Sequence, residues 1–440
     1  MEKSGLLKLS WILILEAVFA GAYISLTRGV FVIYLTSIGY GVEGISLIVL
    51  VSAIASLLIG IFLYRQPSFI VRRVKLKLVS FHALERIMWL LIPLTTSSLV
   101  ISVLYSAYII FSSFVSTFIA FIIYGSLAEY SIRDVTAKRS AANGISSILG
   151  FALGIFLLAF LPPEGKFTYI FPLGTFLGLI STFFILFLNL AHLENAPFPR
   201  VTEQPEKVFS ASSFFLVLLA SGNLMGIVWI PYVMNYLSGP DFLAASMSLA
   251  GTLSSIAASL FWREKAFKTL RVGLALNTLG PAIVLAAPWP TLHVAINAYT
   301  SFTYTGANFL GTFLFAKYNK WFGAVKSSVL LVILGNLSQL IAAPLGILTK
   351  ENYILVFSII MLIKFLAVIL AFVTIPEVAV VPEDVARTYS QVLYNNSLTG
   401  YRVAIEISRE TILTTLRLLA FSLIVVTLYL IYRVLWILIS

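Results

Sequence analysis

The sequence contains no cysteine, and this absence excludes disulfide bonds, thiolate catalysis and cysteine metal sites. Histidine is almost as scarce, because only His82, His192 and His293 occur and they lie far apart in the chain. No metal site is therefore expected. The motifs Gly-x-x-x-x-Gly-Lys-Ser/Thr and His-Glu-x-x-His are also missing, so we predict neither an ATPase nor an intramembrane enzyme, and no cofactor.

Charged residues are also scarce in this sequence. They make up 11% of the 440 residues, whereas hydrophobic residues make up 60%. A soluble domain carries roughly 25% charged residues, so this composition indicates an all-α protein embedded in the lipid bilayer. The apolar runs predict twelve spans, at about residues 9–34, 42–64, 77–96, 99–125, 141–161, 168–191, 210–237, 242–262, 270–288, 291–316, 325–348 and 352–375. No small-residue cleavage site follows the first residues, so the first span is expected to be retained.

The net charge of +11 is distributed unevenly along the chain. The alternate loops hold only Lys166 and Lys350, whereas nineteen basic residues fall in the N-terminus and in every second loop. Those nineteen are Lys3, Lys8, Arg65, Arg72, Arg73, Lys75, Lys77, Arg133, Lys138, Arg139, Arg200, Lys207, Arg263, Lys265, Lys268, Arg271, Lys317, Lys320 and Lys326. Because basic residues favour cytoplasmic loops, we predict a multi-pass protein of the cell membrane with a cytoplasmic N-terminus. The basicity is a topology signal, and no nucleic-acid partner is predicted.

A polar, proline-containing break near the middle of the predicted spans indicates two halves. We predict a six-helix half at 1–192, a cytoplasmic linker at 193–209 and a second six-helix half at 210–378. Short segments match about 200 residues apart, among them YLTS at 34–37 and YLSG at 236–239, as expected for two parallel repeats.

The remaining residues, 379–440, are predicted to hold a polar tail and a further hydrophobic helix. Arg417 and Arg433 lie within the last apolar run, Ile412 to Ile439, about 24 Å apart on a helix, so each could reach an opposite membrane interface. A thirteenth membrane helix is therefore predicted. A helix lying in the interface is the alternative.

The segment LAEYSIRDVTAKRSAANGISSILGFALGI, residues 127–155, resembles the region around the fourth and fifth spans of the major facilitator superfamily. That family has an acidic residue leaving span 4, a basic pair and a glycine-rich span 5. The matching residues are Glu129, Lys138, Arg139, Gly144, Gly150 and Gly154. Phe151 and Ile155 stand where the family has proline and glycine. Small residues at this spacing let helix backbones approach closely.

The loop after the second span is similar in part to another motif of that family, Gly-x-x-x-Asp-Arg-x-Gly-Arg-Arg. Gly60 and Arg65 match, whereas Tyr64 and Pro67 replace the acidic residue and the glycine. The resemblance implies a twelve-helix bundle in two halves and a structural or gating role for the motif residues. It also implies that spans 1, 4, 7 and 10 line a central cavity.

Polar residues on those helices are the candidates for binding a solute. They are Tyr23 and Arg28 in span 1, Asn223 in span 7, and Asn297, Tyr304 and Asn308 in span 10. The span 10 residues, with Ser301 and Thr312, recur at helical spacing and predict one polar face. Such residues can instead join helices by hydrogen bonds, for roughly 0.6 kcal/mol each.

Charged residues within the predicted spans form a second set of candidates, because lipid does not tolerate an isolated charge. Glu16, His82, Glu85 and Arg86 make up this set. Glu85 and Arg86 point about 100° apart on a helix and need not pair, whereas a cluster centred on His82 is compatible with the spacing. One interpretation is an ion network that locks the helices together. The other is that Glu16 or Glu85 carries a coupling proton.

The leading hypothesis is a secondary transporter that moves a small organic solute by alternating access, with protons as the candidate coupling ion. A flippase for lipid-linked intermediates is one alternative. A non-transporting scaffold or sensor that uses the C-terminal tail is another. Basic residues slightly outnumber acidic ones within the spans, which slightly favours an anionic solute, whereas the aromatic residues of the expected lining would equally suit an amphipathic or sugar-like solute.

Overall fold

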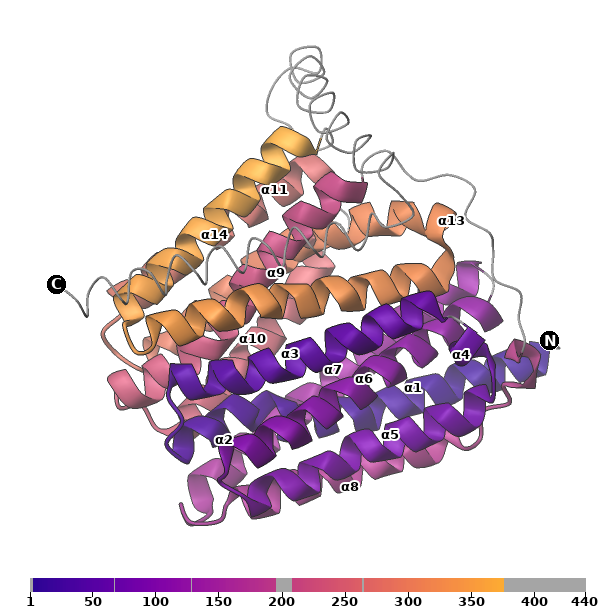
Figure 1. Ribbon diagram of the computed structural model, residues 1–440, viewed down its shortest axis with the longest axis horizontal. Coiled ribbons are helices and arrows are strands. Elements are labelled where there is room, and N and C mark those ends of the chain that lie inside the picture. The colour runs from indigo at the N-terminus through magenta and orange to yellow at the C-terminus, as the bar shows by residue number, and fades with distance from the viewer. Residues whose placement is uncertain (1–2, 67, 128, 195–207, 263–264, 376–440) are drawn as a thin grey trace, which may run out of the picture. The chain divides into compact units, whose positions relative to one another are not determined.

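Helices make up the fold, and no strand occurs in the residues that the structure describes (Figure 1). The computed structural model describes residues 3–66, 68–127, 129–194, 208–262 and 265–375. The helices of the first part of the chain are α1 (Lys3–Leu26), η1 (Arg28–Val30), α2 (Phe31–Ser37), α3 (Val42–Arg65), α4 (Ser68–Val71), α5 (Val74–Leu91), η2 (Ile92–Leu94), α6 (Ser98–Ser126), α7 (Glu129–Phe160), α8 (Phe167–Ile185) and η3 (Ala191–Leu193).

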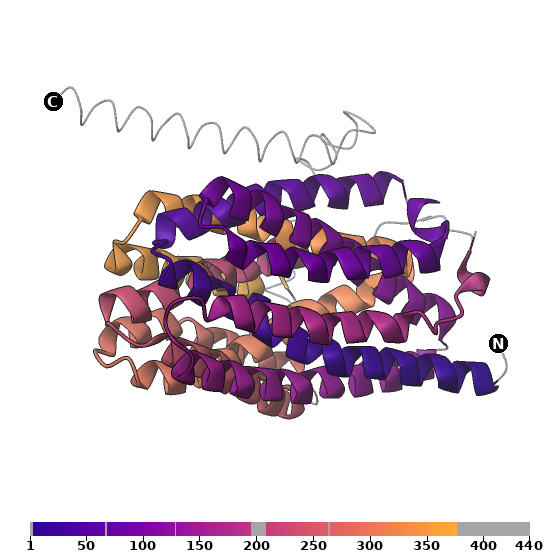
Figure 2. The ribbon, with the colours of Figure 1, turned by 90° about the horizontal axis from the view of Figure 1, so that it is seen from below.

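The second part begins after the predicted linker, most of which lies outside the described residues. Its helices are α9 (Val208–Pro231), the π-helical turn η4 (Tyr232–Tyr236), α10 (Asp241–Trp262), α11 (Phe267–Asn277), α12 (Gly280–Ala286), α13 (Leu292–Thr349) and α14 (Tyr353–Thr374). The long helices run lengthwise through the bundle, and α14 is inclined to α5 and α8 (Figures 1 and 2). The predicted polar tail and thirteenth helix also lie outside the described residues.

Ten of the described helical segments are long and apolar enough to cross a membrane. The predicted helical membrane bundle is thereby confirmed. The predicted spans 77–96 and 291–316 are absent from this set. The first lies on α5, which carries Lys75, Lys77, Glu85 and Arg86, and the second carries the polar face predicted for span 10.

The predicted loop at 317–324 is wrong. Residues 292–349 form one helix of 58 residues, so the backbone stays helical between the two spans predicted there. A straight helix of that length would extend about 87 Å, far beyond a hydrocarbon core of about 30 Å. Figure 1 shows that α13 turns back along the bundle, which lets it supply two spans.

Spans 1 and 9 are interrupted, and span 7 changes its type of helix. Span 1 breaks between α1 and α2, span 7 changes to the π-helical turn η4 after Pro231, and span 9 breaks between α11 and α12. The break in span 1 and the π-helical turn in span 7 fall at corresponding places in the two predicted repeats. Interrupted helices at corresponding places are typical of solute sites in membrane transporters.

Small residues bring α1 and α7 into close contact. A Cβ added at Gly150 would lie 2.9 Å from the Cα of Ala22, and the Ala22 N–H donates to the Ser146 hydroxyl at 3.0 Å. Ser25 donates to the Ser147 carbonyl oxygen at 2.9 Å. Backbone approach and interhelical hydrogen bonds therefore hold this pair of helices together.

Substitution of Gly150 by alanine is expected to destabilise the protein by about 1–3 kcal/mol, because the new methyl group meets backbone atoms of α1 that cannot rotate away. Gly154 is the matched control, since a Cβ there would lie 3.4 Å from the flexible side chain of Leu26. Gly154→Ala should be neutral or slightly stabilising, because alanine favours helix over glycine. Thermal unfolding of both variants in detergent tests this, and equal melting temperatures would contradict it.

Candidate functional site

The break in span 1 places an arginine inside the bundle. α1 ends at Leu26, and Thr27 leaves the helical region with φ −119° and ψ −88°. The Thr27 hydroxyl donates to the Tyr23 carbonyl oxygen at 2.7 Å, so the break does not leave that acceptor unpaired. Arg28 then opens the short helix η1.

The Arg28 side chain is exposed although the side chains around it are buried. Its guanidinium lies close to the hydroxyl groups of Tyr105 and Tyr108 on α6, with the Glu85 carboxylate nearby. Those tyrosines are 8% and 2% exposed. None of the ion pairs found among the described residues includes Arg28. An accessible cation surrounded by buried phenol groups is suited to bind an anion.

Behind Arg28 lies a buried chain of charged and polar groups. Arg86 pairs with the Glu85 carboxylate and also approaches His82 Nε2 at 2.9 Å through Nη2. His82 Nε2 lies 3.4 Å from Glu16 Oε1, and the other oxygen of Glu16 accepts from Arg139 Nη2 at 2.8 Å. The chain therefore links α1, α5 and α7.

Two sequence expectations for this chain can be compared with the structure. The sequence left open whether Glu85 and Arg86 pair, and the structure brings them together. The Arg86 side chain is long enough to fold back along α5, and Gly178 of α8 leaves room for it, since a Cβ there would lie 2.5 Å from Arg86 Cγ. The cluster centred on His82 is present, and its contact with Arg86 is the one that the spacing allowed.

The hydrogen bonds of His82 define its tautomer. Thr182 donates its hydroxyl proton to the Gly178 carbonyl oxygen, so its oxygen accepts from His82 Nδ1 at 2.7 Å. Nδ1 therefore carries the hydrogen, and Nε2 accepts from Arg86. In this state His82 is neutral. A second proton, on Nε2, would break the contact with Arg86 and favour Glu16.

Four buried polar atoms in this region have no hydrogen-bond partner in the described structure. They are Tyr23 Oη, Arg86 Nε, Trp89 Nε1 and Ser106 Oγ. Arg86 stacks over the Tyr23 ring at 4.8 Å, and the Trp89 ring lies 4.7 Å from that of Tyr108. Tyr23 and Trp89 also lie close enough to interact with each other. Buried polar groups are rarely left unpaired, so these atoms could hydrogen-bond a solute or water.

The predicted polar residues of the second part of the chain are not brought to Arg28 as a group. Asn223 donates to Ser338 Oγ at 2.7 Å, which joins α9 to α13. A Cβ added at Gly222 of α9 would lie 3.1 Å from the Tyr304 hydroxyl. Asn308 is engaged as well. The hydrogen bond of Asn223 corresponds to the helix-joining interpretation.

Asn297 and Ser301 line a pocket of about 440 Å³ between α7, α10 and α13. The other polar lining residues were missed in the sequence, and they are Ser248, Thr252, Ser255 and Ser259 of α10. Their spacing of i, i+4, i+7 and i+11 is the signal that could have found them. Phe151 also lines this pocket, and a Cβ added at Gly29, next to Arg28, would lie 2.7 Å from its ring.

The motif residues lie at helix contacts. A Cβ added at Gly60 of α3 would lie 2.9 Å from Ile333 of α13, and Arg139 forms the ion pair with Glu16. Arg65 is exposed in the last turn of α3. Glu129 begins α7, but its side chain lies outside the described residues. Gly154 lies against Leu26 of α1.

A buried lysine marks the break in span 9. Lys364 of α14 is 4% exposed and donates to the Asn277 side-chain oxygen at 2.6 Å and to its carbonyl oxygen at 3.3 Å. Asn277 ends α11, so the ammonium group satisfies acceptors at a helix C-terminus, where a cation is favourable.

No family model matches the chain, and no curated protein matches it. Solved structures do match. A bacterial homologue of the iron transporter ferroportin, in an inward-facing state, gives a TM-score of 0.60 at 14% identity, over 83% of this chain and 98% of that one. The nucleoside transporter NupG gives 0.57 at 14% identity, over 86% and 99%. A bacterial homologue of the human lysosomal transporter Spinster gives 0.56 at 14% identity, over 84% and 96%.

The chain is thus a multi-pass membrane protein built as a helical bundle. Its fold is that of the major facilitator superfamily, as the motifs in span 5 and after span 2 predicted.

Proposed function

We propose that the protein is a secondary transporter of the cell membrane that moves a small organic anion by alternating access. The observation that carries this proposal is Arg28, an accessible guanidinium inside the bundle that forms no ion pair among the described residues. The proposed orientation, with the N-terminus in the cytoplasm, rests on the uneven distribution of basic residues. Proteins with similar folds are described as transporters of nucleosides and metals, and this supports transport without naming a solute.

The chemistry around Arg28 supports an anionic solute. A guanidinium and two phenol hydroxyls can all donate to one carboxylate or phosphate group. The rings of Tyr105, Tyr108 and Trp89 would pack against an apolar or planar portion of the solute. A metal cation would instead require carboxylate, imidazole or thiolate ligands.

We further propose that protons drive the transport through Glu85. Its carboxylate lies near Arg28 and pairs with Arg86, so in the charged form it repels an incoming anion and occupies one of the two cations. Protonation of Glu85 removes the repulsion and frees Arg86. Proton and anion would then bind cooperatively, as a symporter requires. His82 would pass the change on, because its contacts with Arg86 and Glu16 depend on its own proton.

Neutralisation of Glu85 tests the coupling. In proteoliposomes preloaded with a panel of mono- and dicarboxylates, wild type should take up its solute faster when the outside is acidic. Glu85→Gln mimics the protonated form, so it should abolish the dependence on the pH gradient and retain exchange of labelled for unlabelled solute. Glu16→Gln is the comparison, since its carboxylate pairs with Arg139, whereas Glu85 is the carboxylate that acts on Arg28. An unchanged pH dependence in Glu85→Gln would refute coupling through Glu85. Absence of uptake for every carboxylate in the panel would refute the proposal that the solute is an organic anion.

A further inference from the structure

Two ion pairs connect the first part of the chain with the second at one end of the bundle. Lys166 pairs with Asp241, and Lys350 Nζ lies 3.4 Å from Glu43 Oε2. Asp241 begins α10 and Glu43 lies in the first turn of α3, so both acids are at the start of a long helix. Lys166 and Lys350 are the two basic residues of the sparsely charged loops.

The two pairs correspond to one another in the predicted repeats. Each acid follows one of the matched segments, YLTS at 34–37 or YLSG at 236–239. Each base immediately precedes the last helix of its half: Lys166 lies before α8, and Lys350 lies before α14. A contact between halves that occurs twice in corresponding places suits an element that opens and closes when one half rocks against the other.

Both lysines occupy positions that disfavour them. Lys166 is the N-cap of α8, where the helix dipole opposes a positive charge. Lys350 takes a φ of +49°, a conformation in which glycine would be unstrained. Unfavourable local choices of this kind persist when the side chain is needed for something else. Here each side chain reaches an acid in the other part of the chain.

The surroundings of the pairs differ in burial. The side chains of Lys166 and Asp241 are 10% and 13% exposed, whereas those of Lys350 and Glu43 are 65% and 45% exposed. The buried pair also lines a pocket of about 410 Å³ with Tyr34, Phe167 and Met234. Removal of one partner would leave the other charge buried and unpaired in the first case, and hydrated in the second.

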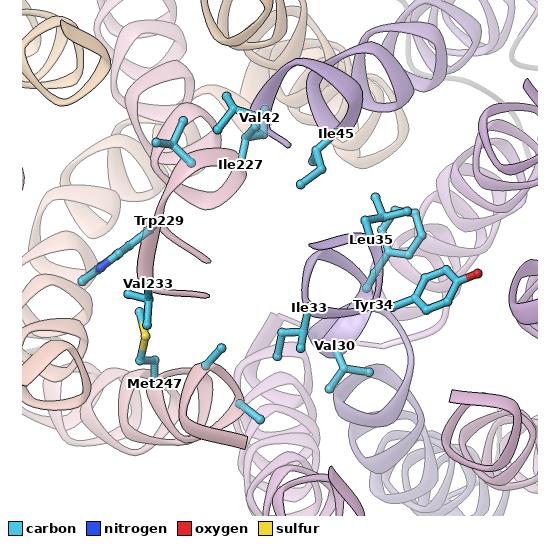
Figure 3. Close-up of a cluster of buried hydrophobic side chains, with 14 of the residues drawn as sticks. Val30, Ile33, Tyr34, Leu35, Val42, Ile45, Ile227, Trp229, Val233 and Met247 are labelled. Atoms are coloured by element: carbon cyan, nitrogen blue, oxygen red, sulfur yellow. The ribbon is translucent and has the colours of Figure 1, made fainter. Parts of the chain in front are cut away.

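Apolar packing lies at the same end. Side chains of α2 and α3, among them Ile33, Leu35 and Val42, belong to one buried cluster with Ile227 and Val233 of α9 and η4 (Figure 3). Opening this end would expose the cluster to water. The ion pairs therefore act together with a hydrophobic contact whose two sides come from different parts of the chain.

We propose that the Lys166–Asp241 and Lys350–Glu43 pairs form a two-part latch that holds this end of the bundle closed, with the buried pair as its main component. The latch rests on the alternating access proposed above. Its test reads only the accessibility of the two ends, so the latch can hold even if the solute is not an anion, and it can fail while anion transport is confirmed.

The absence of native cysteine makes the latch directly measurable, because an introduced cysteine is the only thiol. Val233→Cys reports on the latch end, where Val233 is fully buried. Ser255→Cys reports on the pocket between α7, α10 and α13, about 21 Å along α10 from Asp241. Each cysteine variant is prepared with Lys166 retained and with Lys166→Gln. The purified proteins are treated in detergent with a water-soluble maleimide.

Loss of the buried pair should raise the labelling rate of Val233→Cys at least about tenfold and lower that of Ser255→Cys, because opening one end closes the other. The exchanged pair, Lys166→Asp with Asp241→Lys, should restore both rates. Lys350→Gln should raise Val233→Cys labelling about two- to threefold. Faster labelling of Val233→Cys without a change at Ser255→Cys would mean local loosening and would overturn the latch. No change at either reporter, or no recovery in the exchanged pair, would overturn it as well.

Discussion

Arg28→Gln is expected to weaken binding of the transported anion by about 100-fold while leaving the thermal stability of the empty protein unchanged. Hydrogen bonds to a charged group contribute about 1.5–3 kcal/mol, and every 1.4 kcal/mol is a factor of ten in affinity. Stability should not suffer, because no carboxylate in the described structure depends on Arg28 for an ion pair. Thermal shift of the purified protein against the carboxylate panel measures both quantities together.

Two variants control for this result. Arg28→Lys retains the charge but loses the planar pair of donors, so it should bind more weakly than wild type and more tightly than Arg28→Gln. Arg72→Gln removes an exposed arginine elsewhere and should leave binding intact. If Arg28→Gln melts at a lower temperature without ligand and binds the anion normally, Arg28 is a structural residue. The solute would then have to be sought in the hydroxyl-lined pocket beside Phe151.

The bundle could be predicted from sequence because each of its signals is local. Long apolar runs, alternating loop charge and small residues at helical spacing act over about twenty residues or fewer. The helical backbone at 317–324, where a loop was predicted, could not be recognised this way, because polar residues look the same in a helical turn as in an irregular one. The break at Thr27 falls on polar residues and the change of helix type in span 7 follows Pro231. Polar residues and proline also occur inside continuous helices, as Pro172 does in α8, so these residues alone did not indicate a break.

Only part of the candidate site could be predicted from the sequence. His82, Glu85 and Arg86 share one helix, so helical spacing was enough to suggest their cluster. The link from Glu16 to Arg139 joins residues more than a hundred positions apart, and no pattern within either helix indicates it. The pairing of Lys166 with Asp241 has the same origin. The contacts between charged groups in the folded protein must be known before a structural ion pair can be distinguished from charged residues that take part in transport.

Arg139→Gln is expected to destabilise the protein by about 3–5 kcal/mol, because it leaves the Glu16 carboxylate buried without a cation. Glu16→Gln alone should cost less, since Arg139 is about a quarter exposed and can be hydrated. The double variant should therefore recover most of the stability lost in Arg139→Gln, which is the signature of a coupled pair. Reversible unfolding in mixed detergent micelles gives the four free energies of the cycle.

The result separates two roles within one buried chain. Lys75→Gln, an exposed substitution on α5, controls for the loss of a positive charge and should change the unfolding free energy by less than about 0.5 kcal/mol. If the cycle shows strong coupling and Glu16→Gln still transports, Glu16 and Arg139 lock α1 to α7. Glu85, Arg86 and His82 would then be the residues that couple protons to transport. If the two substitutions instead add independently, the Glu16–Arg139 contact does not hold the helices, and Glu16 becomes the better candidate for the coupling proton.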